Sequence, residues 1–304
     1  DPDRLRLAEA AVQHTQCFAI ADGLQQGQVG AIAIRKQPGF LPLKEFLYRE
    51  DTLGTLSRQE AVSMIPPIFL DVARHHSVLD MCAAPGSKTG QMLEALHWGL
   101  SLEKQGSDHP DGEAQGCVVA NDVDWKRAHM LAHQVQRMGS PGTIVVNTDA
   151  QFFPILKTED AKEFLFDRIL CDVPCSGDGT MRKQPAIWKN WNRMGGNGLH
   201  FRQYTILIRG LNLLKAGGKL VYSTCSLNPM EDEAVVAGAL SFFKGDVRLV
   251  EPPKLEGMKG KEGKTSWKVP KWTEEAAGYL DSHDDIEDES LKLKMLIRQQ
   301  LHYL

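Results

Sequence analysis

The chain of 304 residues is long enough to bury one large core, or a core domain with a smaller appendage. Its composition, 42% hydrophobic and 24% charged, is that of a soluble globular protein. No apolar run approaches the roughly 18 residues of a membrane helix, and the charged N-terminus gives no sign of a signal peptide. Six singly scattered cysteines favour a reducing compartment over a disulfide scaffold.

The formal net charge of −4 argues weakly against a nucleic-acid partner, but the charge is unevenly spread. Lysines gather between positions 254 and 271, and acidic residues dominate positions 274–289. Local basic patches bind phosphates whatever the net charge, so the basic stretch is a candidate phosphate contact. A solvated loop followed by a solvated acidic tail explains the same residues and is the simpler interpretation.

The N-terminal 60 residues are the least regular part of the sequence. A short helix is predicted over residues 43–48. Ser57, with Glu60 three residues later, predicts the capped start of a second helix.

From residue 77 onward, β-rich runs alternate with helical runs. The predicted strands are 77–81, 117–122, 143–147, 168–172 and 219–224. The predicted helices are 89–96, 125–138 and 203–214, the last closed by two glycines at 217–218. This alternation predicts an α/β fold with a parallel sheet and right-handed crossovers, and the polar insert 101–116 is predicted to be a surface loop.

Carboxylates follow several of the predicted strands. In an open α/β sheet the site lies beyond the carboxyl ends of the strands, where Asp80, Asp122 and Asp172 are expected. Asp122 is placed to accept hydrogen bonds from a ribose, and Asp149 to receive an adenine amino group. Taken alone, an aspartate at the position of Asp122 is more often a turn former, and one at the position of Asp149 is equally often a turn residue.

The segment from Leu79 to Thr89 runs from a buried strand through small residues into a helix. Small side chains let a ligand approach the backbone, and a helix N-terminus offers N–H groups to an anion. A phosphate-binding P-loop is excluded because Ser87, not glycine, precedes Lys88, and the three spaced glycines of a dinucleotide fingerprint are also absent. An ordinary strand–turn–helix junction is the alternative.

Cys175 and Cys225 each follow a predicted strand and precede a polar turn, so both thiols are expected to face one cleft. A lone cysteine is usually a small core residue, which is the interpretation for Cys171, in the opposite phase. Two cysteines at the ends of neighbouring strands make that explanation weaker for this pair. No CxxC pair occurs, and no His lies at ligand spacing from these cysteines, so no metal is expected.

With these motifs, the chain resembles the NOP/SUN family of RNA cytosine-5 methyltransferases over residues 57–238. The matching segments, in the family's order, are 80–89, 121–122, 172–183 and 224–226. Further segments resemble the eukaryotic tRNA-modifying branch: 57–67, the loop with Trp188 and Trp191, 198–200, and 228–233.

The resemblance implies a Rossmann-like S-adenosylmethionine-dependent methyltransferase fold, mostly parallel, with helices on both faces of the sheet. It implies that Cys225 adds to carbon 6 of cytosine, so that carbon 5 can take the methyl group, and that Cys175 assists release. The implied S-adenosylmethionine pocket is formed by Cys82, Ala83, Ala84, Pro85, Gly86, Ser87, Lys88, Asp122, Asp149 and Asp172. Lys88 and Asp172 are also expected near the target base. RNA contacts are expected from Arg182, Lys183, Trp188, Lys189, Trp191 and Arg193, although the two tryptophans could instead anchor the loop in the core.

The chain departs from the family pattern at its ends. The N-terminal RNA-binding region is short, and nothing after Val250 matches the late closing strand, whose loss would expose a sheet edge. The expected organisation is an incomplete, partly helical region at 1–56, the methyltransferase domain at 57–250 and a charged extension at 251–304. The expected partner is RNA, most simply tRNA. The protein is expected to be a monomer that binds no metal and no membrane, in the nucleus or nucleolus.

Two alternatives stay open. A catalytically silent RNA-binding scaffold would retain the fold, and the missing closing strand favours it. A DNA cytosine-5 methyltransferase would share the chemistry but use the Pro-Cys thiol, Cys175, as its nucleophile, which the Thr224-Cys225 motif argues against.

Overall fold

The structure is a computed structural model that describes residues 41–98 and 115–280, apart from positions 54, 55, 58, 254, 256, 257, 259, 274 and 275. The predicted surface loop at 101–116 therefore lies almost wholly outside the described residues. The chain forms two compact units, residues 1–147 and 148–304, which are described in turn.

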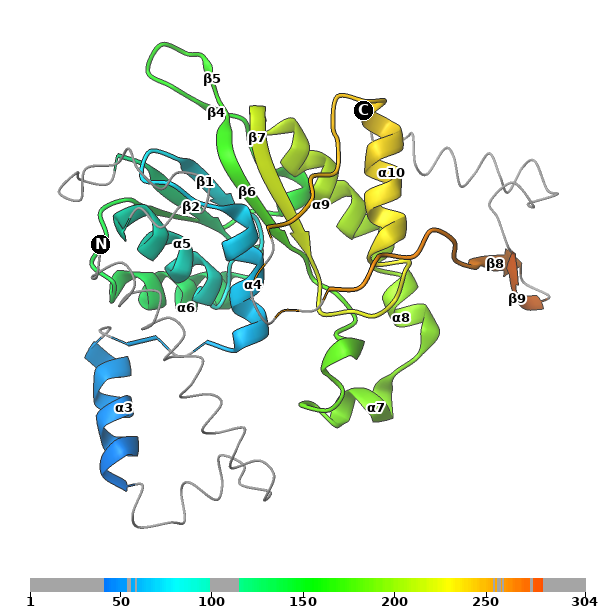
Figure 1. Cartoon of the computed structure of the whole chain (residues 1–304), viewed down its shortest axis with the longest axis horizontal. Helices are drawn as coiled ribbons and strands as arrows, with labels where there is room; N and C mark the ends of the chain where they lie inside the picture. Colours follow the sequence, from blue (N-terminus) through cyan, green and yellow to red (C-terminus); the bar gives the residue numbers. More distant parts are fainter. Residues whose placement is uncertain are drawn as a thin grey trace. The chain divides into compact units, whose positions relative to one another are not determined.

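The first unit contains three parallel strands with helices beside them (Figure 1). Strand β2 (Cys117–Asn121) pairs with β1 (Ser77–Asp80) and with β3 (Thr143–Val146). Helix α5 (Ser87–Trp98) packs on β2, and α6 (Trp125–Gln136) packs on β3. The three strands and two helices confirm the elements predicted from the alternating pattern.

Among the described residues, two helices precede β1, and they correct the predictions for the N-terminal region. Helix α3 spans Leu41–Leu53, longer than the predicted 43–48. Helix α4 spans Ala61–Leu70, with Glu60 at its N-cap and no side-chain capping bond, so the predicted cap at Ser57 is wrong. The start of α4 is tied to tertiary contacts instead, because the Gln59 side chain bonds to Gln91 on α5 and to the carbonyl of Ser63.

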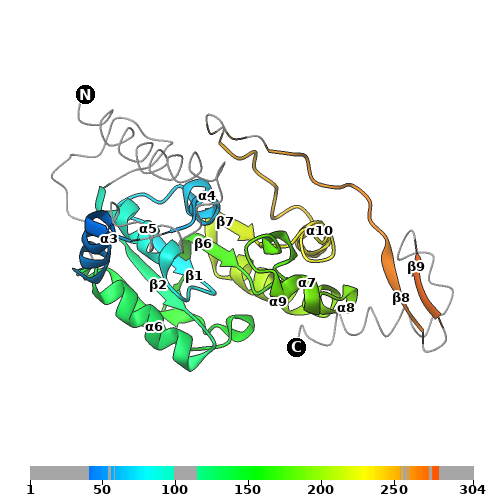
Figure 2. The same ribbon diagram turned by 90° about the horizontal axis from the view of Figure 1, so that it is seen from below.

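The second unit is built on strands β6 (Phe166–Asp172) and β7 (Leu214–Ser223), which are parallel. Helix α9 (His200–Asn212) packs against both strands and against α10 (Glu233–Phe243), and the two helices lie side by side in Figures 1 and 2. Strand β7 begins five residues before the predicted start. Its register against β6 shifts between Leu214 and Lys219, so the two glycines lie within an irregular strand and do not close the preceding helix.

Shorter elements complete the second unit. They are η2 (Ala150–Phe152), β4 (Leu156–Lys157), β5 (Glu163–Phe164), η3 (Asp178–Thr180), α7 (Ala186–Asn190), α8 (Arg193–Asn197), β8 (Val269–Thr273) and β9 (Ala276–Leu280). Strands β8 and β9 form a separate antiparallel pair. Strand β7 is the last strand of its sheet in the part of the chain that the structure describes.

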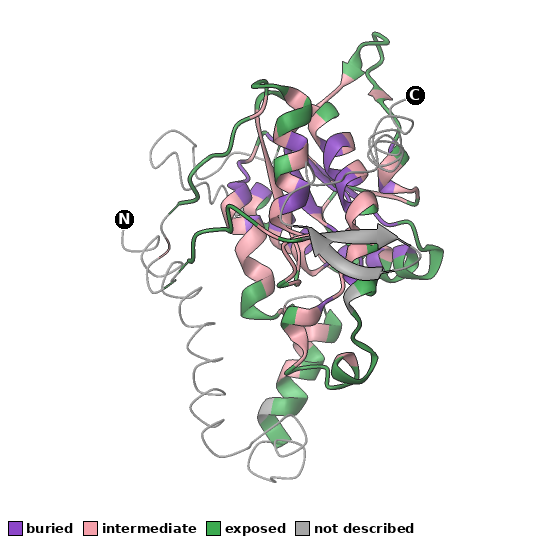
Figure 3. Ribbon diagram, turned by 90° about the vertical axis from the view of Figure 1, so that its right-hand side faces the viewer, coloured by how far each residue is buried: buried purple, intermediate pink, exposed green. Residues whose placement is uncertain are grey.

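Buried residues gather along the strands and the inward faces of their helices (Figure 3). Leu79, Val118 and Ile169 are fully buried, and so is Cys171, which confirms that it is a core thiol. Most residues of β6 are buried, although successive side chains of a strand point to opposite faces of the sheet. Both faces of β6 are therefore covered. No described helix is long and apolar enough to span a membrane.

Candidate active site

In the first unit, residues 81–88 form a loop between β1 and α5 that is held by backbone and buried side-chain bonds. Ala83 donates its N–H to the carbonyl of Asn121 at 2.7 Å, and the Asn121 side chain donates to the carbonyl of Met81 at 3.0 Å. Below the loop, Thr89 donates to Asp80 at 2.7 Å, with both side chains buried. These contacts fix the path of the backbone, so the loop is preorganised.

Gly86 is the one position in this loop where only glycine fits. Its φ is +109°, and a Cβ there would lie 2.9 Å from the Cδ1 atom of Leu131 on α6. The loop can therefore pack closely against α6 only with glycine at position 86. Glycine at position 86 is thus required by packing, and the small residues beside it suit a close ligand.

Asp122, 3% exposed, joins this loop to the end of β2. Its Oδ2 accepts a hydrogen bond from the Ala84 N–H at 3.2 Å and lies 3.3 Å from the Arg127 guanidinium. Its Oδ1 accepts from the Asp124 N–H at 3.0 Å. Arg127 closes the arrangement by donating to the carbonyl of Ala84 at 2.7 Å. Asp122 therefore organises the loop, whatever else it binds.

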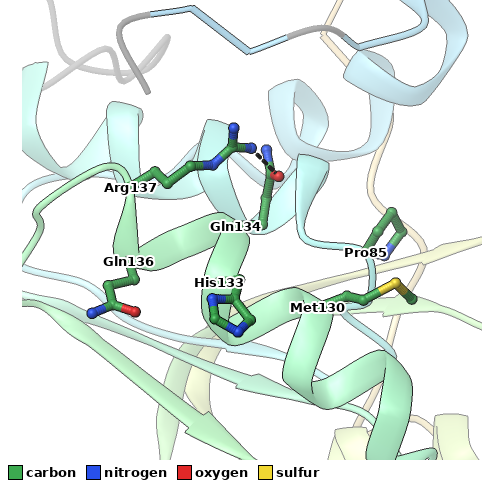
Figure 4. A pocket seen from close by; sticks show the side chains of 6 residues that line it. All are labelled: Pro85, Met130, His133, Gln134, Gln136 and Arg137. Carbon is green, nitrogen blue, oxygen red and sulfur yellow. Dashed lines mark hydrogen bonds between the residues drawn. The ribbon is translucent and has the colours of Figure 1, made fainter. Parts of the chain in front are cut away.

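A surface pocket of about 520 Å³ lies beside this loop (Figure 4). Pro85 lines one end, and side chains of α6 line the rest: Met130, His133, Gln134, Gln136 and Arg137. Arg137 donates to the Gln134 amide across its wall. The pocket shares only Pro85 with the predicted cofactor residues, so it is not the predicted cofactor site.

In the second unit, the two cysteines lie together. Cys175 and Cys225 follow β6 and β7, which are paired through Asp172 and Ser223, and their sulfur atoms are 3.3 Å apart. The Cys225 N–H also points to the Cys175 sulfur at 3.3 Å. The two thiols thus lie together, as expected from the strand ends, with Cys225 exposed and Cys175 half-buried.

The surroundings of Cys175 shift the pKa of its thiol. The hydrogen bond with Cys225, together with burial, strongly raises the pKa of Cys175. Cys175 is therefore protonated at neutral pH and is able to donate its proton to the Cys225 sulfur. Cys225 is the more exposed of the two thiols, so its sulfur is the more open to a substrate.

The loops that follow β6 and β7, which carry Cys175 and Cys225, are also joined by hydrogen bonds outside the thiol pair. Gly179 donates its N–H to the Cys225 carbonyl at 3.0 Å, and Leu227 donates its N–H to Asp178 at 2.6 Å. A Cβ at Gly179 would lie 2.7 Å from that carbonyl, so the loops approach too closely for any side chain. The sulfur contact is therefore part of a wider interface between the loops.

Two acidic residues after Cys225 belong to this site but were given no role from the sequence. Glu231 accepts hydrogen bonds from Ser176 and Ser226, which follow the two cysteines. Asp232 accepts one from Thr224 at 2.5 Å. Burial raises the pKa of Asp232 to about 6, with a smaller opposing effect from the Thr224 hydroxyl. The only signal in the sequence was the resemblance of segment 228–233 to the family.

The remaining predicted cofactor residues have local roles in the structure. Lys88 lies in the first turn of α5 and is half-buried. Asp149 caps η2 by accepting from the Gln151 N–H at 2.9 Å. Asp172 accepts from the Ser223 hydroxyl at 2.7 Å, within the pairing of β6 and β7. No bound molecule tests the ligand roles of these residues, which stay predictions.

The predicted RNA-contact residues lie on an exposed segment around α7, apart from Arg193, whose side chain lies outside what the structure describes. Trp188 and Trp191 are 69% and 53% exposed, so neither anchors this segment in the core. Arg182, Lys183 and Lys189 are exposed as well. Exposed aromatic and basic side chains along one short segment suit stacking and phosphate contacts.

The sequence matches the family described as 16S rRNA methyltransferase RsmB/F over residues 67–281. The chain belongs to this family. It is 53% identical over 250 residues to the multisite-specific tRNA:(cytosine-C(5))-methyltransferase of Saccharomyces cerevisiae, covering 80% of this chain and 35% of that protein. It is also 35% identical over 240 residues to the tRNA (cytosine(49)-C(5))-methyltransferase of Pyrococcus abyssi, covering 79% of this chain and 68% of that protein.

Solved structures agree with this family assignment. The crystal structure of NSun6 from Pyrococcus horikoshii with SFG superposes with a TM-score of 0.57 at 25% identity, covering 72% of this chain and 50% of that one. The expected Rossmann-like methyltransferase fold and the NOP/SUN resemblance are both confirmed. The chain spans about a third of the length of the eukaryotic relatives, 35% and 36% for those of two yeasts.

Proposed function

We propose that this chain is the catalytic part of an S-adenosylmethionine-dependent tRNA cytosine-5 methyltransferase. The observation that carries the proposal is the 3.3 Å contact between Cys175 and Cys225, in a chain that belongs to a family of RNA methyltransferases. Three relatives are about 50% identical to this chain, and each is named as a tRNA cytosine-5 methyltransferase. This makes tRNA the proposed substrate.

The residues of the first unit fit the proposed cofactor. Residues 82–86 are small, α5 begins directly after them, and the Asp122 carboxylate lies at the end of the adjacent strand. The NSun6 structure contains SFG, an analogue of S-adenosylmethionine, which supports the same cofactor here. When bound, S-adenosylmethionine supplies an electrophilic methyl group.

The cysteine pair accounts for the two difficult steps of the proposed reaction. The Cys225 thiolate would add to carbon 6 of cytosine, which makes carbon 5 nucleophilic. Carbon 5 would then take the methyl group from the sulfonium of S-adenosylmethionine, which would leave as neutral S-adenosylhomocysteine. The Cys225 sulfur would then be a neutral thioether that no longer raises the pKa of Cys175, so the Cys175 thiol would be able to lose its proton to water. The Cys175 thiolate then takes the carbon 5 proton, the double bond re-forms, and Cys225 leaves.

A methyl-transfer assay tests the proposal as a whole. The protein, S-adenosylmethionine with a labelled methyl group and unmodified tRNA should yield 5-methylcytosine in the digested RNA. Unmodified DNA of similar length is the control and should remain unlabelled. Labelled DNA with unlabelled tRNA would contradict the proposed substrate.

Asp122→Ala is expected to weaken S-adenosylmethionine binding by about ten- to a hundredfold. A hydrogen bond to a charged acceptor is worth roughly 1.5–3 kcal/mol, which corresponds to that change in affinity. Asp122→Asn is the matched control for the loop, because its side-chain oxygen can still accept from the Ala84 N–H. Calorimetry showing wild-type affinity in the alanine variant would remove Asp122 from the cofactor site.

Removal of basic residues near α7 is expected to reduce the salt dependence of tRNA binding. For each phosphate that the variant no longer neutralises, the slope of log affinity against log salt should fall by roughly 0.7–0.9. Replacing Arg182, Lys183 and Lys189 together tests the segment, and Lys157→Ala, an exposed lysine on β4, is the control. If the triple variant keeps the wild-type slope, the RNA lies elsewhere.

The nuclear or nucleolar location stays a proposal, which microscopy of the tagged protein tests. The described residues hold no group of three or more His, Cys, Asp or Glu side chains that suits a metal ion.

A further inference from the structure

Glu231, between β7 and α10, is an acidic residue with no exposed surface. Burial alone would raise the pKa of its carboxyl group, but hydrogen bonds from Ser176, Ser226 and Gln203 together lower that pKa below its ordinary value. Glu231 is therefore a buried anion at neutral pH. Burial of an anion raises the free energy of the folded state unless hydrogen-bond donors surround the charge, as they do around Glu231.

The donors to Glu231 come from both cysteine loops. Ser176, directly after Cys175, donates its N–H to Oε1 at 2.8 Å and its hydroxyl to Oε2 at 2.6 Å. Ser226, directly after Cys225, donates its hydroxyl to Oε2 at 2.7 Å. One carboxylate is thus bonded to the residue that follows each cysteine.

The rest of the network holds the carboxylate itself in place. Gln203 on α9 donates to Glu231 Oε1 and to the Pro174 carbonyl, both at 3.0 Å, so Cys175 is held through both of its neighbours. The Tyr222 hydroxyl donates to the Glu231 carbonyl at 2.6 Å. Gly196 on α8 packs against the carboxylate so closely that a Cβ there would lie 2.4 Å from Oε2.

We infer that Glu231 is a positioning residue, whose carboxylate bridges Ser176 and Ser226 and thereby sets the separation of the Cys175 and Cys225 sulfur atoms. Glu231 acts on the cysteines through the two serines. Its effect on the reaction rests on the proposed function. A displacement of about 1 Å in such a pair can lower a rate by roughly a hundredfold, so the bridge matters to both the addition and the release steps.

Three variants loosen the bridge without changing either cysteine. Glu231→Gln keeps the size of the side chain but places an N–H₂ group among donors. Gly196→Ala displaces the carboxylate by direct contact. Its matched control is Gly195→Ala in the same helix, where the added Cβ would meet its nearest neighbour at an ordinary 3.5 Å. Of the hydrogen bonds to Glu231, Ser226→Ala removes only the one from Ser226. This variant keeps the test possible if Glu231→Gln fails to fold.

The first readout measures the separation of the thiols and requires no catalysis. Each protein is equilibrated with reduced and oxidised glutathione, and the Cys175–Cys225 disulfide is quantified by peptide mass spectrometry; two thiols are oxidised as one glutathione disulfide is reduced. We expect the equilibrium constant to fall about tenfold in Glu231→Gln, Gly196→Ala and Ser226→Ala, and to be unchanged in Gly195→Ala. Equal equilibrium constants in the wild type and all four variants, or no disulfide in the wild type, would overturn the inference.

The second readout links the bridge to the reaction. With tRNA in a single turnover, Ser226→Ala should slow formation of the covalent protein–RNA complex by about ten- to a hundredfold at unchanged tRNA affinity. Wild-type rates in Ser226→Ala and Gly196→Ala would also overturn it. If the wild type forms the disulfide readily and the variants do not, while no protein methylates RNA, the proposed function fails and the inference stands.

Discussion

Cys225→Ala is expected to abolish methyl transfer while leaving tRNA and S-adenosylmethionine binding intact. The variant cannot form the bond to carbon 6, and removal of a covalent nucleophile lowers turnover by a factor on the order of 10⁶. Cys225 is exposed, so the fold should tolerate alanine. The measurement is a single-turnover methyl-transfer assay, with binding measured separately by calorimetry and filter retention.

A second thiol provides the control for this experiment. Cys117 lies at the start of β2 and is half-buried, so Cys117→Ala removes a comparable thiol outside the cysteine pair. It should retain activity. Full activity in Cys225→Ala would show that Cys225 is not the nucleophile.

Cys175→Ala is expected to accumulate a protein–RNA complex that survives denaturing electrophoresis. The variant can still add to carbon 6 and methylate carbon 5, but it lacks the base that removes the carbon 5 proton. General base assistance is worth roughly 10²–10⁴ in rate, so release should slow by about that factor. The measurement is the fraction of protein shifted on a denaturing gel after incubation with tRNA and S-adenosylmethionine.

The pattern across the two variants separates the remaining alternatives. A trapped complex in Cys225→Ala and none in Cys175→Ala would reverse the roles and favour the DNA-type assignment. Absence of both activity and trapped complex in the wild type and in the variants would favour a silent RNA-binding scaffold.

Much of the fold was predictable from the sequence, because strong local patterns and tertiary packing agree there. Strands β1, β2, β3 and β6 are short apolar runs bounded by turn residues, and each was predicted to within two residues. The errors fall where tertiary contacts override local signals. The start of α4 follows the contact of Gln59 with Gln91, and β7 extends across two glycines because it continues to pair with β6.

The candidate site was predictable only where a residue type and its position on a strand both carried information. Cys175 and Cys225 follow neighbouring strands, and parallel pairing brings them together. The role of Glu231 was not predictable, because its partners Ser176 and Gln203 are 55 and 28 residues away in the sequence. No periodicity links such positions, and only the folded chain shows that one carboxylate joins both loops.

Identification of the cysteine bound to the target base is the most direct test of the proposed mechanism. In tRNA containing 5-fluorocytosine, the fluorine at carbon 5 cannot be removed as a proton, so the adduct formed after methyl transfer persists. Digestion and peptide mass spectrometry should then place the nucleotide on Cys225. A nucleotide on Cys175 would contradict the account.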